Sequence, residues 1–312
     1  MTQLSEHERN HLKYQIYSFR YDDPWIPNKK VAKLVRRPTS TVDRYAKQAE
    51  EEGVLWNGSL GLRHPDRNVS LLLFEDKWRT FKALQKYPAV GYLAVCQGDW
   101  DIMALYDGTM DFSQVPGYKG KIMEGWREEV FTPKVTFTTW ESCFTRMEDF
   151  VNQGESLEKS KITCNLSYPD WNEEEWKMYW YFRSNLRKKF CKLRKDYLIS
   201  WRKYKEWKST LKKYCTIMLE YYPEGYKAYD SITFCFRTDY ENTLVELFSN
   251  FPTASFFYKV GEYLLANAFL PQDFEQQTRL YETLSQLLKK RILTEYTDGH
   301  NIVYYLRPAP GD

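Results

Sequence analysis

Lysine and arginine gather in two stretches of the chain, at spacings suited to binding a polyanion. The first runs over 29–48 and mixes basic with small polar residues. The second, 187–213, holds twelve Lys and Arg against only Asp196 and Glu206, a local charge of +10 in a chain whose total is +3. Cationic side chains bind DNA phosphates by releasing counterions, and polar side chains on one helix face read base edges.

The candidate DNA contacts divide by role. We expect base reading in the first stretch from Ser40, Thr41, Asp43, Arg44, Lys47 and Gln48. We expect phosphate contacts around them from Lys29, Lys30, Lys33, Arg36, Arg37, Thr39, Arg63, His64 and Arg67. The second stretch would contact phosphates through Lys188, Lys189, Lys192, Arg202, Lys203, Lys205, Lys208, Lys212 and Lys213. Phosphate contacts position a protein on the duplex, while base contacts specify the sequence.

Three predicted helices would position the first set. Ser5 and Glu8 have the spacing of a capping box that opens a helix over 5–21. A short helix over 29–37 follows, then a helix over 41–52 with apolar residues on one face and Gly53 after its end. Strand-like segments near 54–56 and 69–74 would form a hairpin. This order predicts a winged helix-turn-helix whose third helix enters the major groove.

The remainder of the first half predicts a ferredoxin-like βαββαβ sandwich. We expect strands over 69–74, 90–96, 100–106 and 134–139, with helices over 77–86 and 118–128.

The chain repeats this layout. Lys29-Lys30-Val-Ala-Lys-Leu matches Lys188-Lys189-Phe-Cys-Lys-Leu at an offset of 159, and Tyr87-Pro88 later matches Phe251-Pro252 at 164. The predicted fold class is therefore α+β, with two tandem units that each join a winged helix-turn-helix to a βαββαβ domain. We expect boundaries at 1–68 and 69–145 for the first unit, a linker over 146–169, and 170–228 and 229–312 for the second.

Four motifs carry a resemblance to a known family. They are Val31–Leu34 with Ser40–Tyr45 and Glu52–Leu55, then Gln97–Met103, Tyr258–Leu265 and Lys290–Thr297. In this order they resemble the Lrp/AsnC family of transcription regulators, whose ligand-binding domain is called the RAM domain. The resemblance implies that the two sandwich domains pair sheet to sheet. It also implies an effector such as an amino acid, bound near Gly98, Asp99, Asp101, Gly261 and Glu262. The competing interpretation is that these glycines simply form β-turns.

The second unit departs from the pattern. No glycine follows its third predicted helix, and its turn lacks the small polar cap found at Thr39 and Ser40. It would bind phosphates with little base discrimination, or serve as an electrostatic clamp or partner surface. Trp201, Tyr204, Trp207 and Leu211 recur at helical spacing, which favours core packing over stacking on single-stranded nucleic acid.

Composition narrows the class of protein. The chain has 312 residues, of which 43% are hydrophobic, and no apolar run approaches the ~20 residues that span a bilayer. We expect a cytoplasmic globular protein, without membrane contact, whose six cysteines pack as small apolar groups. Four scattered histidines suggest no metal site, and we expect no cofactor.

The favoured function is a DNA-binding transcription regulator, one chain acting as a covalent pseudo-dimer that also has surfaces for homodimerisation. We expect it not to be an enzyme. A siroheme-decarboxylase-like enzyme on a similar layout is the first alternative, and the absence of histidine from 65 to 299 argues against it. A small-molecule-sensing adaptor is the second.

Overall fold

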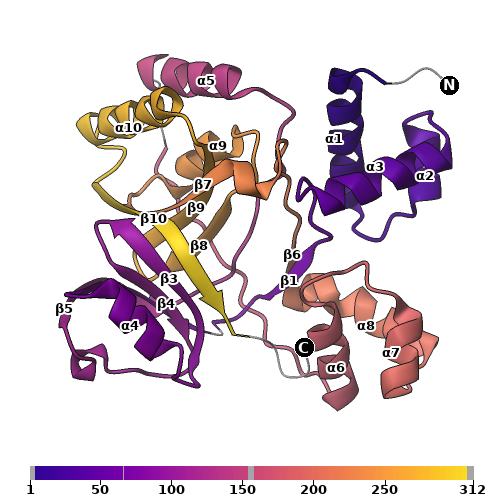
Figure 1. Cartoon of the computed structure of the whole chain (residues 1–312), viewed down its shortest axis with the longest axis horizontal. Helices are drawn as coiled ribbons and strands as arrows, with labels where there is room; N and C mark the ends of the chain where they lie inside the picture. The colour runs from indigo at the N-terminus through magenta and orange to yellow at the C-terminus, as the bar shows by residue number, and fades with distance from the viewer. Residues whose placement is uncertain (1–3, 66, 154–157, 308–312) are drawn as a thin grey trace.

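Two three-helix heads lie beside a large curled sheet in the computed structural model, which describes residues 4–65, 67–153 and 158–307. The heads occupy one end of the molecule and the sheet the other (Figure 1). The mixed helix and strand content, with its order of elements, confirms the α+β prediction.

The first head consists of α1 (Glu6–Asp22), α2 (Asn28–Leu34) and α3 (Thr39–Glu51). The predicted capping box begins α1: Ser5 Oγ accepts the Glu8 amide at 3.2 Å, and Glu8 Oε2 accepts the Ser5 amide at 2.9 Å. The buried face of α3 contains the predicted residues Val42, Tyr45, Ala46 and Ala49.

The second head consists of α6 (Glu173–Phe182), α7 (Phe190–Tyr197) and α8 (Trp201–Tyr214). Tyr204, Trp207 and Leu211 are buried, so the aromatic periodicity does mark core, although Trp201 is 52% exposed. The expectation of an uncapped turn is wrong, because Ser200 Oγ accepts the Lys203 amide at 3.3 Å and caps α8.

The two heads share one ribbon. Strand β1 (Ser59–Leu62) pairs antiparallel with β6 (Cys215–Met218), in register from Ser59↔Met218 to Leu62↔Cys215. The hairpin predicted within the first unit is therefore replaced by a pairing between units. Neither β1 nor β6 therefore forms the free wing that a DNA-binding module projects into a groove.

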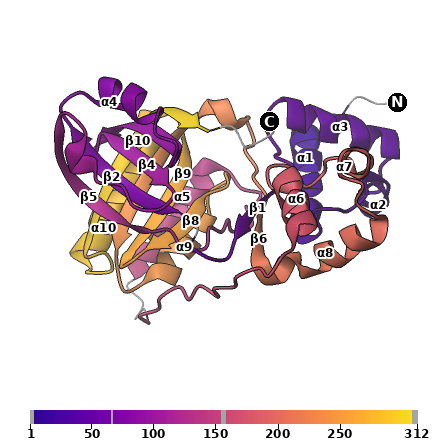
Figure 2. The ribbon, with the colours of Figure 1, turned by 90° about the horizontal axis from the view of Figure 1, so that it is seen from below.

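The main sheet has eight strands in the antiparallel order β5-β2-β4-β3-β10-β7-β9-β8. Its strands are β2 (Asn68–Phe74), β3 (Val90–Gly98), β4 (Ile102–Tyr106), β5 (Tyr118–Trp126), β7 (Tyr229–Arg237), β8 (Phe256–Val260), β9 (Tyr263–Pro271) and β10 (Glu295–Leu306). Each unit supplies four strands, and the halves join at β3 and β10. Isolated bridges Arg127↔Val260 and Phe131↔Phe257 bring the outer edges together, so the sheet curls almost into a barrel (Figure 2).

The second half has the full predicted βαββαβ order, with α9 (Glu241–Ser249) and α10 (Phe274–Lys289). The first half keeps only α4 (Lys77–Leu84). Residues 118–128, predicted as a helix, contain β5 instead, preceded by the short 3-10 helix η1 (Phe112–Gln114). Gly117, Gly120 and Gly125 disfavour a helix there.

A further difference follows β5. Residues 134–139, predicted as a strand, are outside any named strand, and α5 (Trp140–Gln153) extends into the region predicted as a linker. Arg279 of α10 binds Glu141 and Glu148 of α5 at 2.7 and 2.6 Å. The first half therefore lacks the second helix of the predicted βαββαβ order. Helix α5, which follows β5 in the chain, packs on α10 of the second half.

Apolar side chains fill the inside of the curled sheet. Val69, Leu71, Met103 and Leu265 come from both units and are buried there. Gly299 is required beside Trp100, because a Cβ on it would lie 2.6 Å from Trp100 Cε2. Four of the six free cysteines are buried, as expected for small apolar side chains. Within the part of the chain that the structure describes, none of the helices combines the length and the apolar character needed to cross a membrane.

Candidate functional site

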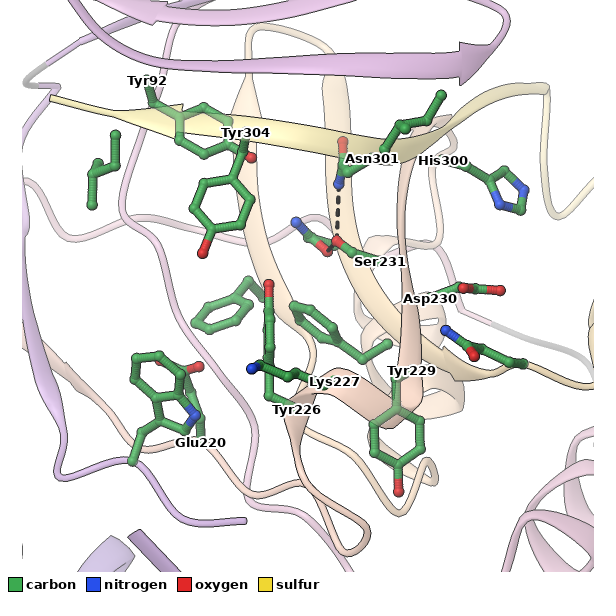
Figure 3. A pocket seen from close by; sticks show the side chains of 17 residues that line it. Tyr92, Glu220, Tyr226, Lys227, Tyr229, Asp230, Ser231, His300, Asn301 and Tyr304 are labelled. Carbon is green, nitrogen blue, oxygen red and sulfur yellow. Dashed lines mark hydrogen bonds between the residues drawn. The ribbon is translucent and has the colours of Figure 1, made fainter. Parts of the chain in front are cut away.

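A cavity opens where two neighbouring strands separate. β10 pairs with β7 only as far as His300↔Ile232, but it pairs with β3 to Leu306↔Tyr92. The change follows a register shift between Asn301 and Val303, as a β-bulge produces. At this end of the sheet lies a cavity of about 820 Å³, called here the sheet-mouth cavity (Figure 3).

Aromatic side chains make up much of the cavity wall. Tyr92 and Tyr304 stack with ring centroids 6.2 Å apart, and Tyr226 packs against Phe269 at 5.2 Å and Trp56 at 5.9 Å. The aromatic lining residues are Trp56, Tyr92, Tyr226, Tyr229, Phe256, Phe269 and Tyr304. Such walls suit a flat, largely apolar ligand.

A neutral hydrogen-bond network lies between the diverging strands. Asn301 Nδ2 donates to Ser231 Oγ at 2.9 Å and to Thr233 Oγ1 at 3.1 Å. Ser231 Oγ donates in turn to Asn267 Oδ1 at 3.1 Å. Cys96 Sγ donates to Asn301 Oδ1 at 3.3 Å. Figure 3 shows the bond that Asn301 makes from β10 to Ser231 on β7. These bonds link β10 to β7 and to β3 at the point where β10 and β7 diverge, which is called here the fork.

Four ionisable residues line the cavity besides its tyrosines: Glu220, Lys227, Asp230 and His300. Burial raises the pKa of Glu220 to about 7, although a bond donated by the Tyr222 hydroxyl at 3.0 Å acts in the opposite direction. Asp230 Oδ2 accepts a bond from Gln277 Nε2 at 2.9 Å. A carboxyl group that titrates near neutrality in a cavity is typical of a proton-transfer site.

Tyr226 and Lys227 lie in the 3-10 helix η2 (Tyr226–Ala228) and line the same cavity, with Tyr226 near the Glu220 carboxyl group. Burial, helped by the nearby Tyr304 and Glu220, raises the pKa of Tyr226 to about 12. Its hydroxyl therefore remains a hydrogen-bond donor at neutral pH.

The residues predicted to bind an effector lie elsewhere. Asp99 exchanges two bonds with Asp298: its amide donates to the Asp298 carbonyl at 2.8 Å, and its Oδ2 accepts the Asp298 amide at 2.9 Å. A Cβ on Gly98 would lie 2.4 Å from that same carbonyl oxygen. Gly98 and Asp99 thus join β3 to β10.

The other three predicted effector residues also make structural contacts or turns. Asp101 Oδ2 accepts the Phe74 amide at 2.9 Å. Gly261 has a φ of +59° in the turn between β8 and β9, and Glu262 pairs with Arg237 at 2.8 Å. The structure does not bring the five residues together, and none of them lines the sheet-mouth cavity.

The predicted DNA contacts of the first head are mostly exposed. Lys29, Lys30, Arg36, Thr39, Ser40 and Arg44 lie on the surface, while Thr41 is half-buried. Arg37 pairs with Glu8 at 3.4 Å, and Lys47 with Glu51 at 3.3 Å. Arg63 does not project from a free wing, because it is half-buried and pairs with Glu129 at 3.3 Å.

In the second head, the basic face is only partly free. Lys189, Lys192, Arg202 and Lys205 are exposed, but Lys203 pairs with Glu174, and Lys188 is half-buried over the Tyr181 ring. Lys208 lies 4.0 Å above the Trp25 ring of the first head, so its expected free exposure does not hold.

Sequence reasoning missed the sheet-mouth cavity. Its most informative signal is Glu220 within Leu219-Glu220-Tyr221-Tyr222, a lone carboxyl group in an apolar and aromatic run. Asn301 carries no comparable signal, because the bulge that directs it toward Ser231 depends on pairing with β3.

Comparisons with known proteins give a fold. No protein-family model and no protein of curated function matches the sequence. Over nearly its whole length the chain shares an α+β fold with a solved structure. The solved structure that supports this is siroheme decarboxylase NirDL, at 12% identity and a TM-score of 0.53, covering 96% of this chain and 93% of that one.

Two further structures are similar at lower scores. NirDL in complex with an iron-uroporphyrin III analogue gives 10% identity and a TM-score of 0.43, with 90% of this chain and 87% of that one covered. An AsnC-family transcriptional regulatory protein from Pyrococcus furiosus gives 16% identity and 0.26, covering 40% of this chain and 89% of that one.

These findings correct one prediction. The expectation that the chain is not an enzyme is contradicted, because the fold that it shares over 96% of its length is that of an enzyme. The absence of histidine between 65 and 299 does not argue against an enzyme, since a tyrosine or a carboxyl group can also transfer a proton.

Proposed function

We propose that this chain is an enzyme that removes a carboxylate, as carbon dioxide, from a planar aromatic molecule bound in the sheet-mouth cavity. The observation that carries the proposal is Glu220, a carboxyl group with a pKa of about 7 in the wall of an aromatic-lined cavity. The full-length structural neighbour, a siroheme decarboxylase, supports the same class of reaction on this fold.

The reaction needs one proton and no oxidant. When the carbon–carbon bond to the carboxylate breaks, its electron pair stays on the substrate, where an attached aromatic ring delocalises it. The same carbon then takes up one proton, so that R–CH2–COO⁻ and H⁺ become R–CH3 and CO2. Glu220 is suited to hold that proton, because a pKa near the working pH balances protonation against the driving force for transfer.

The neighbouring side chains suit the binding step. The aromatic walls would hold the ring, while the ammonium group of Lys227 and the hydroxyl of Tyr226 would orient one carboxylate. Both come from η2 and line the same cavity as Glu220, and Tyr226 lies near the Glu220 carboxyl group (Figure 3).

The test incubates the full chain with siroheme and, separately, with a porphyrin carrying a single acetate group, and measures carbon dioxide release and product mass. We expect at least one ligand to lose carbon dioxide. Glu220→Gln should slow that reaction roughly 100-fold or more while ligand binding persists. Glu246→Gln, which changes an exposed carboxyl group on α9, is the matched control. Release from neither ligand, or full activity in Glu220→Gln, would refute the proposal.

Double-stranded DNA binding by a transcription regulator is the second candidate function. It is favoured by the exposed basic residues of α2, of the α2–α3 turn and of α7, among them Lys30, Arg36 and Lys192. The shared β1–β6 ribbon and the contact between Lys208 and Trp25 leave less free surface than the sequence predicts.

A mobility-shift assay on random duplex DNA across a salt series tests this candidate. Regulator-type binding predicts a steep loss of affinity with salt. Alanine at Arg44 and Lys47 should relax sequence preference, whereas alanine at Lys188 and Lys189 should weaken all sequences alike. No shift at low salt would exclude DNA binding.

A further inference from the structure

The sheet-mouth cavity contains little positive charge. Its ionisable residues other than tyrosine are two carboxyl groups, Glu220 and Asp230, one ammonium group, Lys227, and His300. No arginine lines it, among the residues that the structure describes. A single lysine is enough to pair with one carboxylate but leaves additional carboxylates unpaired.

The arginine that directly follows β10 is bonded to the backbone. Arg307 follows the last residue of β10 and donates from Nε to the Val90 carbonyl at 2.8 Å. Its Nη2 donates to the carbonyls of Gln85 and Tyr87 at 3.1 and 2.6 Å. Releasing this guanidinium for a ligand would leave three carbonyl groups without their donor.

The surface next to the cavity offers little additional positive charge to a ligand. Beyond Trp56 and Tyr226, which line both spaces, lies a second cavity of about 600 Å³. Its charged lining residues are Glu50, Glu51, Glu52, Lys188, Glu224 and Lys227. Glu50, Glu51 and Glu52 pair with Arg20, Lys47 and Lys13. A ligand that extended past Trp56 would therefore gain only one additional lysine, Lys188, beside carboxyl groups that mostly have partners.

The remaining polar groups are neutral donors and acceptors. Asn267 Nδ2 has no protein acceptor among the described residues, and its Oδ1 is held by Ser231. The hydroxyls of Tyr92, Tyr226 and Tyr304 likewise form none of the protein hydrogen bonds found in the described part of the chain. Neutral groups recognise ring nitrogens, carbonyls or one carboxylate without needing a counter-charge.

We infer that the sheet-mouth cavity selects a planar aromatic ligand with a single carboxylate and excludes polycarboxylated macrocycles. This inference rests on the proposed function and narrows its substrate class. Above pH 7, where Glu220 is ionised, several carboxylates would face Glu220 and Asp230, whose charges repel theirs, with only the ammonium group of Lys227 to pair with. One carboxylate can pair with Lys227 and accept bonds from the tyrosine hydroxyls.

The test uses three ligands that share one ring and differ in charge. They are uroporphyrin III with eight carboxylates, coproporphyrin III with four, and a porphyrin with a single acetate. Quenching of tryptophan fluorescence in the full chain gives each Kd, since Trp56 lines the cavity. We expect the single-acetate ligand to bind at least about tenfold more tightly than uroporphyrin III, because its charge is repelled least.

A double variant separates charge from ring hydrophobicity. At a pH above the pKa of about 7 of Glu220, Glu220→Gln with Asp230→Asn should tighten uroporphyrin III binding by about tenfold and change the single-acetate ligand much less, because it removes two negative charges. Glu246→Gln with Glu282→Gln removes two exposed charges from residues that do not line the cavity and should leave all three Kd values unchanged.

The outcomes of this test distinguish a failure of the charge selection from a failure of the proposed function. Tighter binding of uroporphyrin III than of the single-acetate ligand, or equal effects of the two double variants, would overturn the charge selection while leaving an aromatic-binding enzyme in place. Binding of none of the three would overturn the proposed function together with this inference.

Discussion

Asn301 of β10 donates its side-chain amide to Ser231 of β7 at 2.9 Å, where the two strands stop pairing. The bond spans the fork that forms the sheet-mouth cavity, and a second bond from the same nitrogen reaches Thr233 at 3.1 Å. One side chain therefore links β10 to β7 within the second unit, while β10 continues beside β3 of the first unit. We expect the opening of the cavity to depend on this link.

Replacing Asn301 should loosen the fork. In Asn301→Ala the hydroxyls of Ser231 and Thr233 lose a shared donor, and we expect a loss of about 1–3 kcal/mol in the free energy of unfolding. Urea titration measures it. Gln114→Ala, which removes exposed side-chain bonds near η1, should stay within about 0.5 kcal/mol of the parent. Equal stability of Asn301→Ala and Gln114→Ala would show that the Asn301 side chain does not stabilise the fork.

Much of the fold could be predicted from local patterns. Ser5 and Glu8, the apolar stripe of α3 and the order of strands around α9 and α10 depend on residues near one another in the sequence. The failures involve pairing over long distances. β1 pairs with β6 of the other unit, and 118–128 becomes β5 because β2 offers it a partner edge. Neither partner is visible in a local window.

The candidate site was less predictable than the fold. The family resemblance predicts that Gly98 and Asp99 bind an effector. In the structure both residues contact the backbone of Asp298, which lies 199 residues beyond Asp99. The sequence does not predict a functional role for Glu220, because a single carboxyl group forms no spacing pattern with other residues. Its environment comes from Tyr222, Tyr226 and Tyr304, which only the folded chain brings together.

The raised pKa of Glu220 makes stability depend on pH. A carboxyl group whose pKa rises from an ordinary 4.5 to about 7 on folding favours the folded state at low pH, and that contribution is lost as pH rises through 7. The upper bound is roughly 3 kcal/mol, from about 1.4 kcal/mol per pKa unit. Compared with Glu220→Gln, the parent should lose stability between pH 4.5 and pH 7.5 in urea titrations. Parallel stability curves for the two proteins would contradict the raised pKa.

Gly98 should be needed for the fold. In Gly98→Ala the new Cβ would meet the Asp298 carbonyl oxygen at 2.4 Å, on a backbone with a φ of +148°. We expect a loss of roughly 3 kcal/mol or more, since backbone strain adds to a clash with main-chain atoms. Gly108→Ala is the matched control, with a φ of +68° and nothing within 4 Å of the new Cβ. It should cost only about 1 kcal/mol. Similar losses of thermal stability in Gly98→Ala and Gly108→Ala would mean that the junction between β3 and β10 can adjust to the added Cβ.

Arg187 joins the two heads. Its Nη1 donates to the carbonyls of Pro24 and Ile26 at 3.1 and 3.2 Å, beside the stacking of Lys208 on Trp25. Because both carbonyls would lose their donor, Arg187→Ala should lower stability by about 1–3 kcal/mol and speed amide exchange around α2. Arg194→Ala, at an exposed position of α7, should change neither. Unchanged exchange at Ile26 and Asn28 in Arg187→Ala would show that the heads are held together by other contacts, with the β1–β6 ribbon as the main one.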